Sequence, residues 1–344
     1  MLNVGINGLG RIGRAIFRLN MKNNVFNVVA INDTNPSNEN LCYMLKYDST
    51  YGVLDAKIDN GKDFIKVNNN SIRIYHEQNI SKVPWEKYKV DVVIDASGVY
   101  ENLNFKDELK EKGIKHQIVT NTPDSELIDK YIILGVNEKS VFEDSNFLIS
   151  SGICDANAVA PVLDILNTEY EIEHGFLTTL HPWLSYQNLL DGPSRSFAYP
   201  GTIIENFALG RSSINTMIPK TTSAIRASEK VLKYLENKFQ SLSFRVPTAI
   251  VSTADISVKL KKNTAKDEIV ELFNNIVLNQ KLNIIKNNYE PLVSTDFIGS
   301  ESSAIIDQRW TQFNDSNYLK LILWYDNEWA YGSRVVDLVN ILSY

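Results

Sequence analysis

A glycine-rich turn near the N-terminus has the residue types and spacing of a dinucleotide-binding site. Gly8, Gly10 and Gly13 follow the pattern G-x-G-x-x-G between an apolar run and a stretch with helical periodicity. Such a turn lets the backbone approach a pyrophosphate at a helix N-terminus. Asp33 follows the next apolar run, where a carboxylate can accept hydrogen bonds from an adenosine ribose. Together these features predict dinucleotide binding.

The residues around Asp33 bear on which dinucleotide is bound. A carboxylate at this position repels a 2′-phosphate, so Asp33 favours NAD. The neighbouring Thr34 carries a hydroxyl that could donate to such a phosphate, whereas residues 35–37 offer no cation. We therefore expect NAD as the cofactor, with NADP left open as an alternative.

Cys154 and His181 are the candidate nucleophile and base. Cys154 follows an apolar run over 147–150 and opens a helical pattern, so its sulfur should lie at a helix N-terminus, where the dipole favours a thiolate. His181 ends an apolar stretch, and functional groups often collect where a strand ends. The alternative is that Cys154 is a buried, unreactive cysteine and that His181 is a structural histidine whose hydrogen bonds are made within the protein. The only other cysteine, Cys42, fits that description in its apolar surroundings.

Composition excludes several classes of protein. The 344 residues carry a net charge of −6 without any run of Lys or Arg, which argues against nucleic-acid and membrane-surface partners. Apolar stretches are far shorter than the ~20 residues of a membrane span, and the N-terminus is not a secretory signal, so we expect a cytoplasmic protein. Two cysteines give no disulfide framework, and the four histidines show no ligand spacing, so we expect no metal site.

The first half of the chain alternates apolar strands with helical segments. Strands are predicted over 2–7, 26–31, 90–95, 117–120, 131–134 and 147–150. This alternation predicts an α/β fold with a doubly wound, mostly parallel sheet of the Rossmann type. The near-continuous apolar character of these strands fits burial on both faces.

Beyond residue 150 the pattern changes to longer segments in which polar and apolar residues alternate. Residues 171–180 and 249–260 predict a largely antiparallel sheet. A helix is predicted after Thr264, with Asp267 as its capping partner, and another over 327–342 with Asn327 as its cap. The second domain is therefore expected to be α+β.

Seven short motifs, in order along the chain, resemble the glyceraldehyde-3-phosphate dehydrogenase family. They are NGLGRIGR (7–14), IND (31–33), LKYDST (45–50), GVN (135–137), FRVPT (244–248), EPLVS (290–294) and WYDNE (324–328). The resemblance implies that Cys154 attacks an aldehyde, that His181 is the base and that Asn327 orients the nicotinamide carboxamide. It also implies a homotetramer.

The same resemblance implies the domain organisation and further cofactor contacts. The last helix would return to the first domain, giving a dinucleotide-binding domain of residues 1–153 and 327–344 and a catalytic domain of residues 154–326. The residues expected to line the cofactor are Gly8, Gly10, Arg11, Ile12, Gly13, Asp33, Thr34, Ser97, Gly98, Asn121 and Asn327.

The chain departs from the family where the substrate anion should bind. Asp155 stands beside the nucleophile in place of a hydroxyl residue, where it would repel phosphate and the thiolate or would cap the new helix. Leu184 replaces another hydroxyl, and the loop 191–219 is longer than in the family. The substrate-binding candidates are Asp155, Thr222, Ser223, Arg245 and Arg211, of which Thr222 and Arg245 match the family, with Lys220 and Arg195 as substitutes for lost donors.

Three interpretations follow. The first is a divergent phosphorylating glyceraldehyde-3-phosphate dehydrogenase, with inorganic phosphate as acceptor, in which Lys220, Arg195 or Arg211 replace the lost donors. The second applies the same chemistry to another aldehyde, or uses water or another acceptor. The third is a cofactor-binding interaction protein without turnover.

Overall fold

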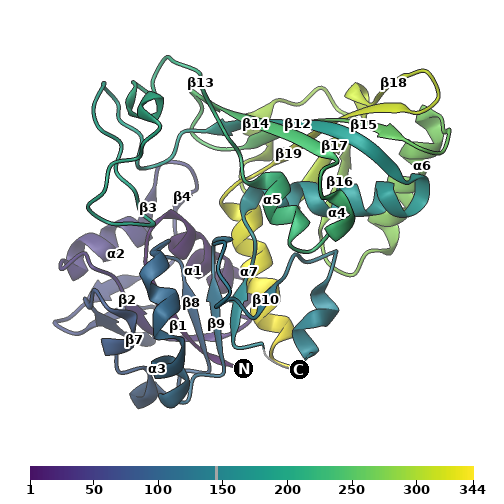
Figure 1. Ribbon diagram of the computed structural model, residues 1–344. Helices are drawn as coiled ribbons and strands as arrows, with labels where there is room; N and C mark the ends of the chain where they lie inside the picture. Colours follow the sequence, from purple (N-terminus) through teal and green to yellow (C-terminus); the bar gives the residue numbers. More distant parts are fainter. Residues whose placement is uncertain (144–145) are drawn as a thin grey trace.

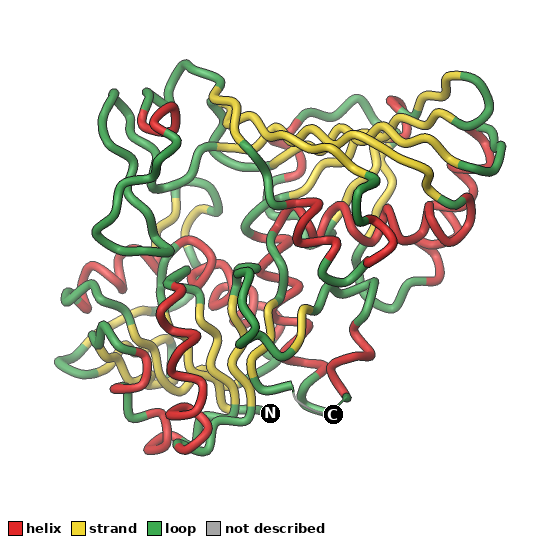
Figure 2. Tube along the Cα trace, viewed as in Figure 1, coloured by secondary structure: helices red, strands yellow, loops and turns green. Residues whose placement is uncertain are grey.

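The computed structural model describes residues 1–143 and 146–344, and two large sheets dominate it (Figures 1 and 2). The first sheet has nine strands in the order β10-β11-β9-β8-β1-β2-β7-β6-β5. All neighbours from β10 to β7 run parallel, and only β6 and β5 at one edge are antiparallel. The strands are β1 (Asn3–Asn7), β2 (Asn27–Asn32), β5 (Ile58–Asn60), β6 (Phe64–Val67), β7 (Asn70–Tyr75), β8 (Val92–Asp95), β9 (His116–Val119), β10 (Lys130–Tyr131) and β11 (Leu148–Ser150). The predicted Rossmann-type sheet is confirmed.

The carboxyl ends of the central parallel strands are joined by a buried polar network. Asn7 donates from Nδ2 to Asp95 Oδ1 at 2.9 Å, and Asn32 donates from Nδ2 to Asn7 Oδ1 at 2.7 Å. These strand ends are where ligands bind in open α/β sheets. The helices of this half are α1 (Arg11–Asn23), α2 (Asn38–Lys46) and α3 (Lys106–Glu111), and a small hairpin is formed by β3 (Tyr47–Asp48) and β4 (Gly52–Val53).

One predicted strand is much shorter than expected. β10 ends at Tyr131 rather than at Leu134. The side chain of Asn137 accepts a hydrogen bond from the Ile133 amide and donates to the Tyr131 carbonyl. These bonds close a turn over the buried apolar residues, which therefore belong to the core without being part of a strand.

The second sheet has the order β13-β14-β12-β15-β19-β17-β16, with β18 paired to β19. Most of its neighbours are antiparallel; β12 with β14 and β16 with β17 are the parallel pairs. The predicted, largely antiparallel α+β half is thus confirmed. Its strands are β12 (Ile172–Pro182), β13 (Ile218–Lys220), β14 (Phe239–Val246), β15 (Ser252–Leu260), β16 (Ile285–Asn288), β17 (Ala304–Asp307), β18 (Gln312–Asn314) and β19 (Tyr318–Tyr325).

Helices α4 (Cys154–Tyr170) and α5 (Ala224–Glu229) lie on the side of this sheet that faces the first half, and α6 (Lys266–Asn279) lies at its far end (Figure 1). The predicted start of α6 is close to the observed one, but its capping partner differs. Glu268, not Asp267, accepts hydrogen bonds from the Thr264 hydroxyl at 2.6 Å and the Ala265 amide at 3.3 Å.

The last helix, α7 (Trp329–Ile341), lies between the two halves (Figure 1). It packs against α1 at Gly332, where an added Cβ would lie 3.0 Å from Leu19 Cδ1. The predicted cap at Asn327 is wrong: Asp326 Oδ1 accepts hydrogen bonds from the amides of Glu328 and Trp329. The Asn327 side chain instead accepts a hydrogen bond on Oδ1 from the Val251 amide at 3.1 Å.

Membrane-spanning helices were also sought among residues 1–143 and 146–344. None of the helices there is both long and apolar enough to cross a bilayer.

Candidate active site

Cys154 is the first residue of α4, as predicted. The chain leaves β11 and turns through Gly152, whose φ of +75° is in the left-handed region that favours glycine. Asn157 holds the turn by donating from Nδ2 to the carbonyls of Ser151 (2.9 Å) and Ile153 (3.0 Å). The thiol is therefore fixed at the helix N-terminus and partly exposed to a cavity.

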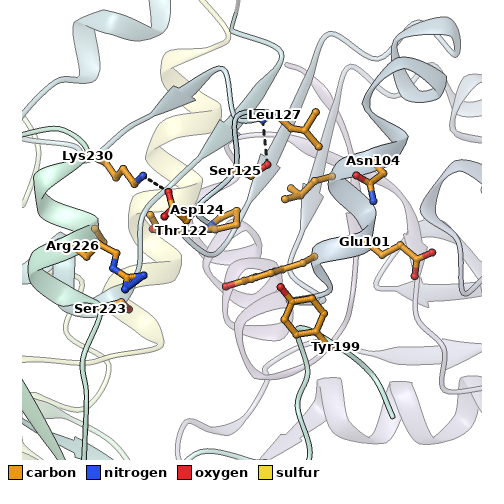
Figure 3. Close-up of a pocket in the computed structure, with 14 residues that line it drawn as sticks. Glu101, Asn104, Thr122, Asp124, Ser125, Leu127, Tyr199, Ser223, Arg226 and Lys230 are labelled. Carbon is orange, nitrogen blue, oxygen red and sulfur yellow. Dashed lines mark hydrogen bonds and ion pairs between the residues drawn. The ribbon is translucent and has the colours of Figure 1, made fainter. Parts of the chain in front are cut away.

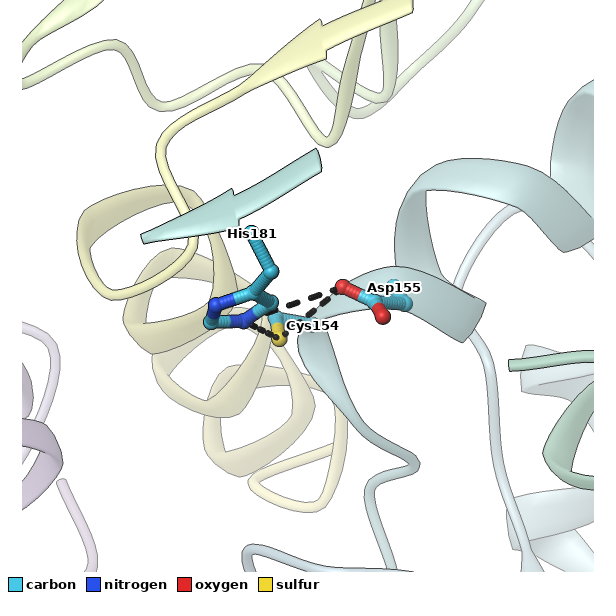
Figure 4. Close-up of side chains that lie close together, drawn as sticks. All are labelled: Cys154, Asp155 and His181. Carbon is cyan, nitrogen blue, oxygen red and sulfur yellow. Dashed lines mark hydrogen bonds and ion pairs between the residues drawn. The ribbon is translucent and has the colours of Figure 1, made fainter. Parts of the chain in front are cut away.

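His181 lies near the end of β12 and faces this thiol (Figure 4). Its Nε2 atom is 3.6 Å from Cys154 Sγ, and its Nδ1 atom is 2.8 Å from the Pro182 carbonyl oxygen. Because a carbonyl oxygen only accepts, Nδ1 carries the proton in the neutral ring. The lone pair of Nε2 is thus directed at the sulfur, as a general base for the thiol requires.

A third side chain, Asp155, completes the cluster (Figure 4). Its Oδ1 atom lies 3.5 Å from Cys154 Sγ and 3.9 Å from His181 Nε2, and it accepts a hydrogen bond from the Tyr325 hydroxyl at 2.8 Å. The Thr222 hydroxyl is 3.4 Å from the other carboxylate oxygen. Asp155 is thus a buried neighbour of the nucleophile.

Burial and charge set the protonation states of the pair. Burial raises the pKa of the Cys154 thiol well above its usual value, and the Asp155 carboxylate raises it further, while Arg245 acts in the opposite direction. Burial lowers the pKa of His181 to about 4, with Arg245 adding to the effect and Asp155 opposing it. Both shifts favour a neutral thiol and a neutral imidazole. Burial and the Asp155 carboxylate therefore outweigh the effect of the helix dipole, which favours the thiolate.

Two cations from β13 and β14 border the cluster. Arg245 is the β-sheet partner of His181, and its Nη2 atom donates to the Tyr186 hydroxyl at 3.2 Å. It is buried, its Nε atom has no hydrogen-bond partner, and it makes no ion pair within residues 1–143 and 146–344. Burial, followed by the charge of Arg245, lowers the pKa of Lys220 to about 8. An unpaired buried guanidinium is suited to binding an anion.

The cavity in front of Cys154 measures about 630 Å³ and joins the predicted catalytic and cofactor residues. From the catalytic half it is lined by Cys154 and His181 together with apolar side chains of the 183–197 region. From the nucleotide-binding half and the C-terminal segment it is lined by Arg11, Ile12, Thr120, Asn327, Glu328 and Tyr331. Tyr331, which sequence analysis did not select, donates to the Gly152 carbonyl at 3.0 Å and so supports the turn before the nucleophile.

The glycine-rich turn has the shape that a dinucleotide needs. Gly8 has a φ of +92°, and a Cβ on Gly13 would lie only 2.0 Å from the Gly8 carbonyl oxygen, so both positions require glycine. Nothing lies within 4 Å of a Cβ placed on Gly10, which leaves the backbone accessible. Asp33, directly after β2, accepts hydrogen bonds from the amides of Leu9 at 2.6 Å and Asn35 at 2.8 Å. Its carboxylate is thereby fixed beside the turn.

The other predicted cofactor residues follow strands β2, β8 and β9. Asn121 leaves its Oδ1 atom buried without a partner, which fits a site for a polar ligand. Ser97 instead donates its hydroxyl to Asp95 at 2.6 Å, next to Gly98 with its φ of +76°. Thr34 is exposed.

Arg11 has a role that the sequence did not indicate. Its guanidinium contacts Asp48 and Glu328, each at 2.6 Å. Its side chain is thus held by protein carboxylates, and its backbone amide lies at the start of α1, where a phosphate would bind. Asp48 lies in the motif LKYDST and Glu328 in the motif WYDNE. The sequence therefore contained both residues, but it did not show that they pair with Arg11.

The predicted anion-binding residues divide into two groups. Arg245 and Thr222 lie beside the cluster. Arg211 does not: it pairs at the surface with Asp191 (Nε to Oδ2, 2.8 Å). Ser223 precedes α5 and lines a separate cavity instead.

This second cavity, of about 590 Å³, is formed where the long loop meets the nucleotide-binding half (Figure 3). Tyr199 of the loop packs edge-on against Tyr100 at 5.5 Å between ring centroids, and the Tyr100 amide donates to the Ala198 carbonyl. Lys230 pairs with Asp124 at 2.6 Å on the opposite wall. The long loop therefore covers part of the nucleotide-binding half.

Comparison with known proteins agrees with this geometry. Residues 2–103 match the family model "Glyceraldehyde 3-phosphate dehydrogenase, NAD binding domain", and residues 153–327 match "Glyceraldehyde 3-phosphate dehydrogenase, C-terminal domain". The chain belongs to the glyceraldehyde-3-phosphate dehydrogenase family. NAD is accordingly its cofactor.

Curated relatives of the glyceraldehyde-3-phosphate dehydrogenase family align over nearly the whole chain. "Glyceraldehyde-3-phosphate dehydrogenase 2" of Bacillus subtilis is 35% identical over 341 residues, covering 98% of this chain and 96% of the relative. "Glyceraldehyde-3-phosphate dehydrogenase 2" of Saccharomyces cerevisiae is 34% identical over 339 residues and covers 98% of both chains. "Glyceraldehyde-3-phosphate dehydrogenase" of Colletotrichum lindemuthianum is 33% identical over 338 residues, with 98% and 96% covered. This supports a general dehydrogenase function for the family member described here.

Proposed function

We propose that this family member oxidises an aldehyde through a covalent thioester on Cys154, with NAD as the hydride acceptor. The observation that carries the proposal is the 3.6 Å approach of His181 Nε2 to Cys154 Sγ, with the proton of the ring held on Nδ1 by the Pro182 carbonyl. An inert cysteine would not need a histidine fixed in the tautomer that removes its proton.

The chain's own groups can carry each proton of such a reaction. Transfer of the thiol proton to His181 Nε2 frees the sulfur to add to the aldehyde carbon, and the protonated ring then donates to the oxygen of the thiohemiacetal. NAD, when bound at the glycine-rich turn, supplies the acceptor for the hydride that leaves this carbon. The hydroxyl proton returns to His181 as the thioester forms. An acceptor oxygen then attacks the thioester carbon, the C–S bond breaks and the sulfur is released.

The substrate that fits best carries an anionic group. Arg245 is buried beside His181 without an ion-pair partner, and Lys220 lies close enough for the two cations to affect the same histidine. A phosphorylated aldehyde such as glyceraldehyde 3-phosphate would neutralise this charge. These residues support the first interpretation of the sequence.

A second candidate concerns the acceptor and is favoured by Asp155. Its carboxylate, 3.5 Å from the sulfur, would repel an incoming inorganic phosphate by several kcal/mol if desolvated. Water carries no such penalty, and a carboxylate can remove its proton. Release of the free acid by hydrolysis is therefore the alternative outcome.

The experiment is NADH formation by the purified protein with glyceraldehyde 3-phosphate, with and without inorganic phosphate, alongside a panel of unphosphorylated aldehydes. Phosphate-dependent turnover would favour inorganic phosphate as the acceptor. Phosphate-independent turnover would favour hydrolysis. If NAD binds but no aldehyde is oxidised, the dehydrogenase proposal fails and the interaction protein is favoured.

We also propose a homo-oligomer, a tetramer by family resemblance. The sheet face away from α4 carries exposed apolar side chains, including Phe176, Leu180 and Leu242 on β12 and β14. A face of this kind is typical of an interface between subunits. Light scattering on the purified protein tests this, and a monomer at micromolar concentration would contradict it.

A further inference from the structure

Three potential metal ligands of different chemistry converge at the N-terminus of α4. The distances are 3.6 Å from Cys154 Sγ to His181 Nε2, 3.5 Å from Sγ to Asp155 Oδ1, and 3.9 Å from Nε2 to Oδ1 (Figure 4). Within the described residues, this is the group of three His, Cys, Asp or Glu side chains whose ligand atoms all lie within 4.8 Å of one another. Spacing along the sequence did not indicate it, because the fold brings His181 of β12 to the first two residues of α4.

These distances are close to those of a tetrahedral zinc site. Zinc binds sulfur at about 2.3 Å, nitrogen at about 2.0–2.1 Å and carboxylate oxygen at about 2.0–2.2 Å. With tetrahedral angles, the ligand atoms are then separated by about 3.6 Å for sulfur and nitrogen, about 3.5 Å for sulfur and oxygen, and about 3.3 Å for nitrogen and oxygen. Both distances from the sulfur match. The third, from Nε2 to Oδ1, is longer by about 0.6 Å.

The surroundings also hold His181 and Asp155 in the form that zinc binds, whereas the Cys154 thiol releases its proton when the metal binds. The hydrogen bond from His181 Nδ1 to the Pro182 carbonyl leaves the Nε2 lone pair free, which is the usual arrangement of a zinc-bound histidine. The Tyr325 hydroxyl donates to Asp155 and fixes the carboxylate, again as outer partners of metal ligands do. A divalent cation would neutralise the two negative charges of a thiolate and a carboxylate placed side by side.

We propose that Cys154, Asp155 and His181 form a binding site for Zn²⁺ whose fourth position is open to the cavity. The neighbouring cations Arg245 and Lys220 oppose the charge of the ion, which favours an exchangeable ion over a permanent structural one. On family resemblance a hydroxyl residue occupies the place of Asp155, so the site is a property of this chain rather than of the family.

Bound zinc would block the nucleophile. A thiolate bound to the metal is a much weaker nucleophile towards an aldehyde carbon, and Nε2 of His181 cannot take a proton while it is a ligand. We therefore expect reversible inhibition of aldehyde oxidation by Zn²⁺. This consequence rests on the proposed function, whereas zinc binding itself does not.

The test measures binding without substrate or NAD. Zinc-free protein is titrated with Zn²⁺ in competition with a chromophoric chelator, and separately with Co²⁺, whose thiolate charge-transfer absorption reports a Co–S bond. We expect one ion per chain and a charge-transfer band. Asp155→Asn and Cys154→Ser should each weaken zinc binding by more than about tenfold. Cys42→Ser, which removes the other cysteine, and Asp124→Asn, which removes an exposed acid, are the matched controls and should bind as the parent does.

NAD affinity and the thermal unfolding temperature show whether each variant is folded. Failure to bind one equivalent of Zn²⁺, or binding that Asp155→Asn and Cys154→Ser leave unchanged, would overturn the proposal. Loss of binding in these two variants with retention in both controls supports it. If the parent oxidises no aldehyde at all, the proposed function fails, and the binding measurement still decides the zinc site.

Discussion

The carboxylate of Asp155 lies 3.5 Å from the sulfur of Cys154 and receives the hydroxyl of Tyr325 at 2.8 Å. The nucleophile of this protein is therefore next to a fixed, buried acceptor of hydrogen bonds. A thiol can donate to such an oxygen, but a thiolate is repelled by it. Asp155 thus stabilises the resting thiol, and its effect must be overcome by a cation or by the base His181.

Replacing this carboxylate should make the nucleophile more reactive. Asp155→Asn keeps the size of the side chain and removes its charge, so the pKa of Cys154 should fall, and each unit of pKa increases the thiolate fraction about tenfold. We expect alkylation of Cys154 by iodoacetamide at pH 7 to accelerate by about tenfold, followed by mass spectrometry of its peptide. Burial raises the pKa of Cys42 to about 11, which makes it an internal control in the same sample. An unchanged rate at Cys154 would mean that Asp155 does not control the thiol.

His181 should make the stability of the fold depend on pH. Its pKa is about 4 in the folded protein against 6.5 as a free side chain, so the unfolded chain binds more protons between these values. The contribution of neutral His181 is complete above about pH 6.5 and is lost as the pH falls towards 4. His181→Asn cannot titrate. Relative to this variant, the parent should lose about 2 kcal/mol of unfolding free energy between pH 7.5 and pH 4.5.

Urea denaturation at the two pH values measures this difference. His174→Asn serves as the control because it removes a partly exposed histidine from the same strand. Its pH dependence should follow that of the parent. A parent and a His181→Asn variant with parallel pH profiles would contradict the burial of a neutral imidazole.

Arg245 should distinguish phosphorylated from unphosphorylated substrates. Its buried guanidinium has an Nε atom without a partner, so Arg245→Gln removes a charge that only an anionic substrate would use. We expect KM for glyceraldehyde 3-phosphate to rise more than about tenfold, corresponding to a loss of more than about 1.4 kcal/mol of binding. KM for an unphosphorylated aldehyde should change far less.

Two further arginines complete this experiment. Arg73→Gln removes an exposed charge of β7 that pairs with Asp63, and it should leave both KM values as in the parent. Arg211→Gln tests whether Arg211 binds the substrate anion, as the sequence predicted. Because its guanidinium pairs with Asp191 at the surface, we expect a much smaller increase in KM than for Arg245→Gln. Equal effects of Arg211→Gln and Arg245→Gln would show that the long loop reaches the substrate.

Periodicity was sufficient to predict both sheets but not their edges. The runs at β1, β2 and β8 are apolar on both faces, so burial alone identifies them as parallel strands. Residues 132–134 are just as apolar, yet they form a buried turn held by Asn137, because side-chain hydrogen bonds are invisible to a hydrophobic pattern. The same reason explains the two capping errors. Asp326 caps α7 in place of the predicted Asn327, and Glu268 caps α6 in place of the predicted Asp267.

The site was predictable in its parts and not in its electrostatics. A predicted helix start located Cys154, a predicted strand end located His181, and the motif FRVPT located Arg245. The raised pKa of Cys154 depends on its burial and on the Asp155 carboxylate, and the convergence of three ligand atoms depends on the contact of His181 in β12 with the start of α4. A single sequence holds no record of that contact. Arg211 is the opposite case: its residue type suits an anion site, but the fold pairs it with Asp191 at the surface.

The ion pairs of Arg11 should link the C-terminal segment to the nucleotide-binding half. The guanidinium contacts Glu328, just before α7, and Asp48, just after α2, and both carboxylates are nearly inaccessible to solvent. Removing the cation leaves two buried carboxylates without the Arg11 ion pair, which is more costly than removing the cation and the carboxylates together. Because Arg11 itself is about one-third exposed, we expect Arg11→Gln to lower the unfolding free energy by about 2 kcal/mol, measured by urea denaturation.

A double-mutant cycle separates this coupling from the loss of either residue alone. Glu328→Gln should destabilise the protein by itself, and the double variant should be less unstable than the sum of the two single variants by at least about 1 kcal/mol. The coupling should persist in part at high salt, since Glu328 is largely shielded from water. Simple additivity would mean that the contact between Arg11 and Glu328 does not hold α7 against the first half, and that the packing of Gly332 on α1 does so alone.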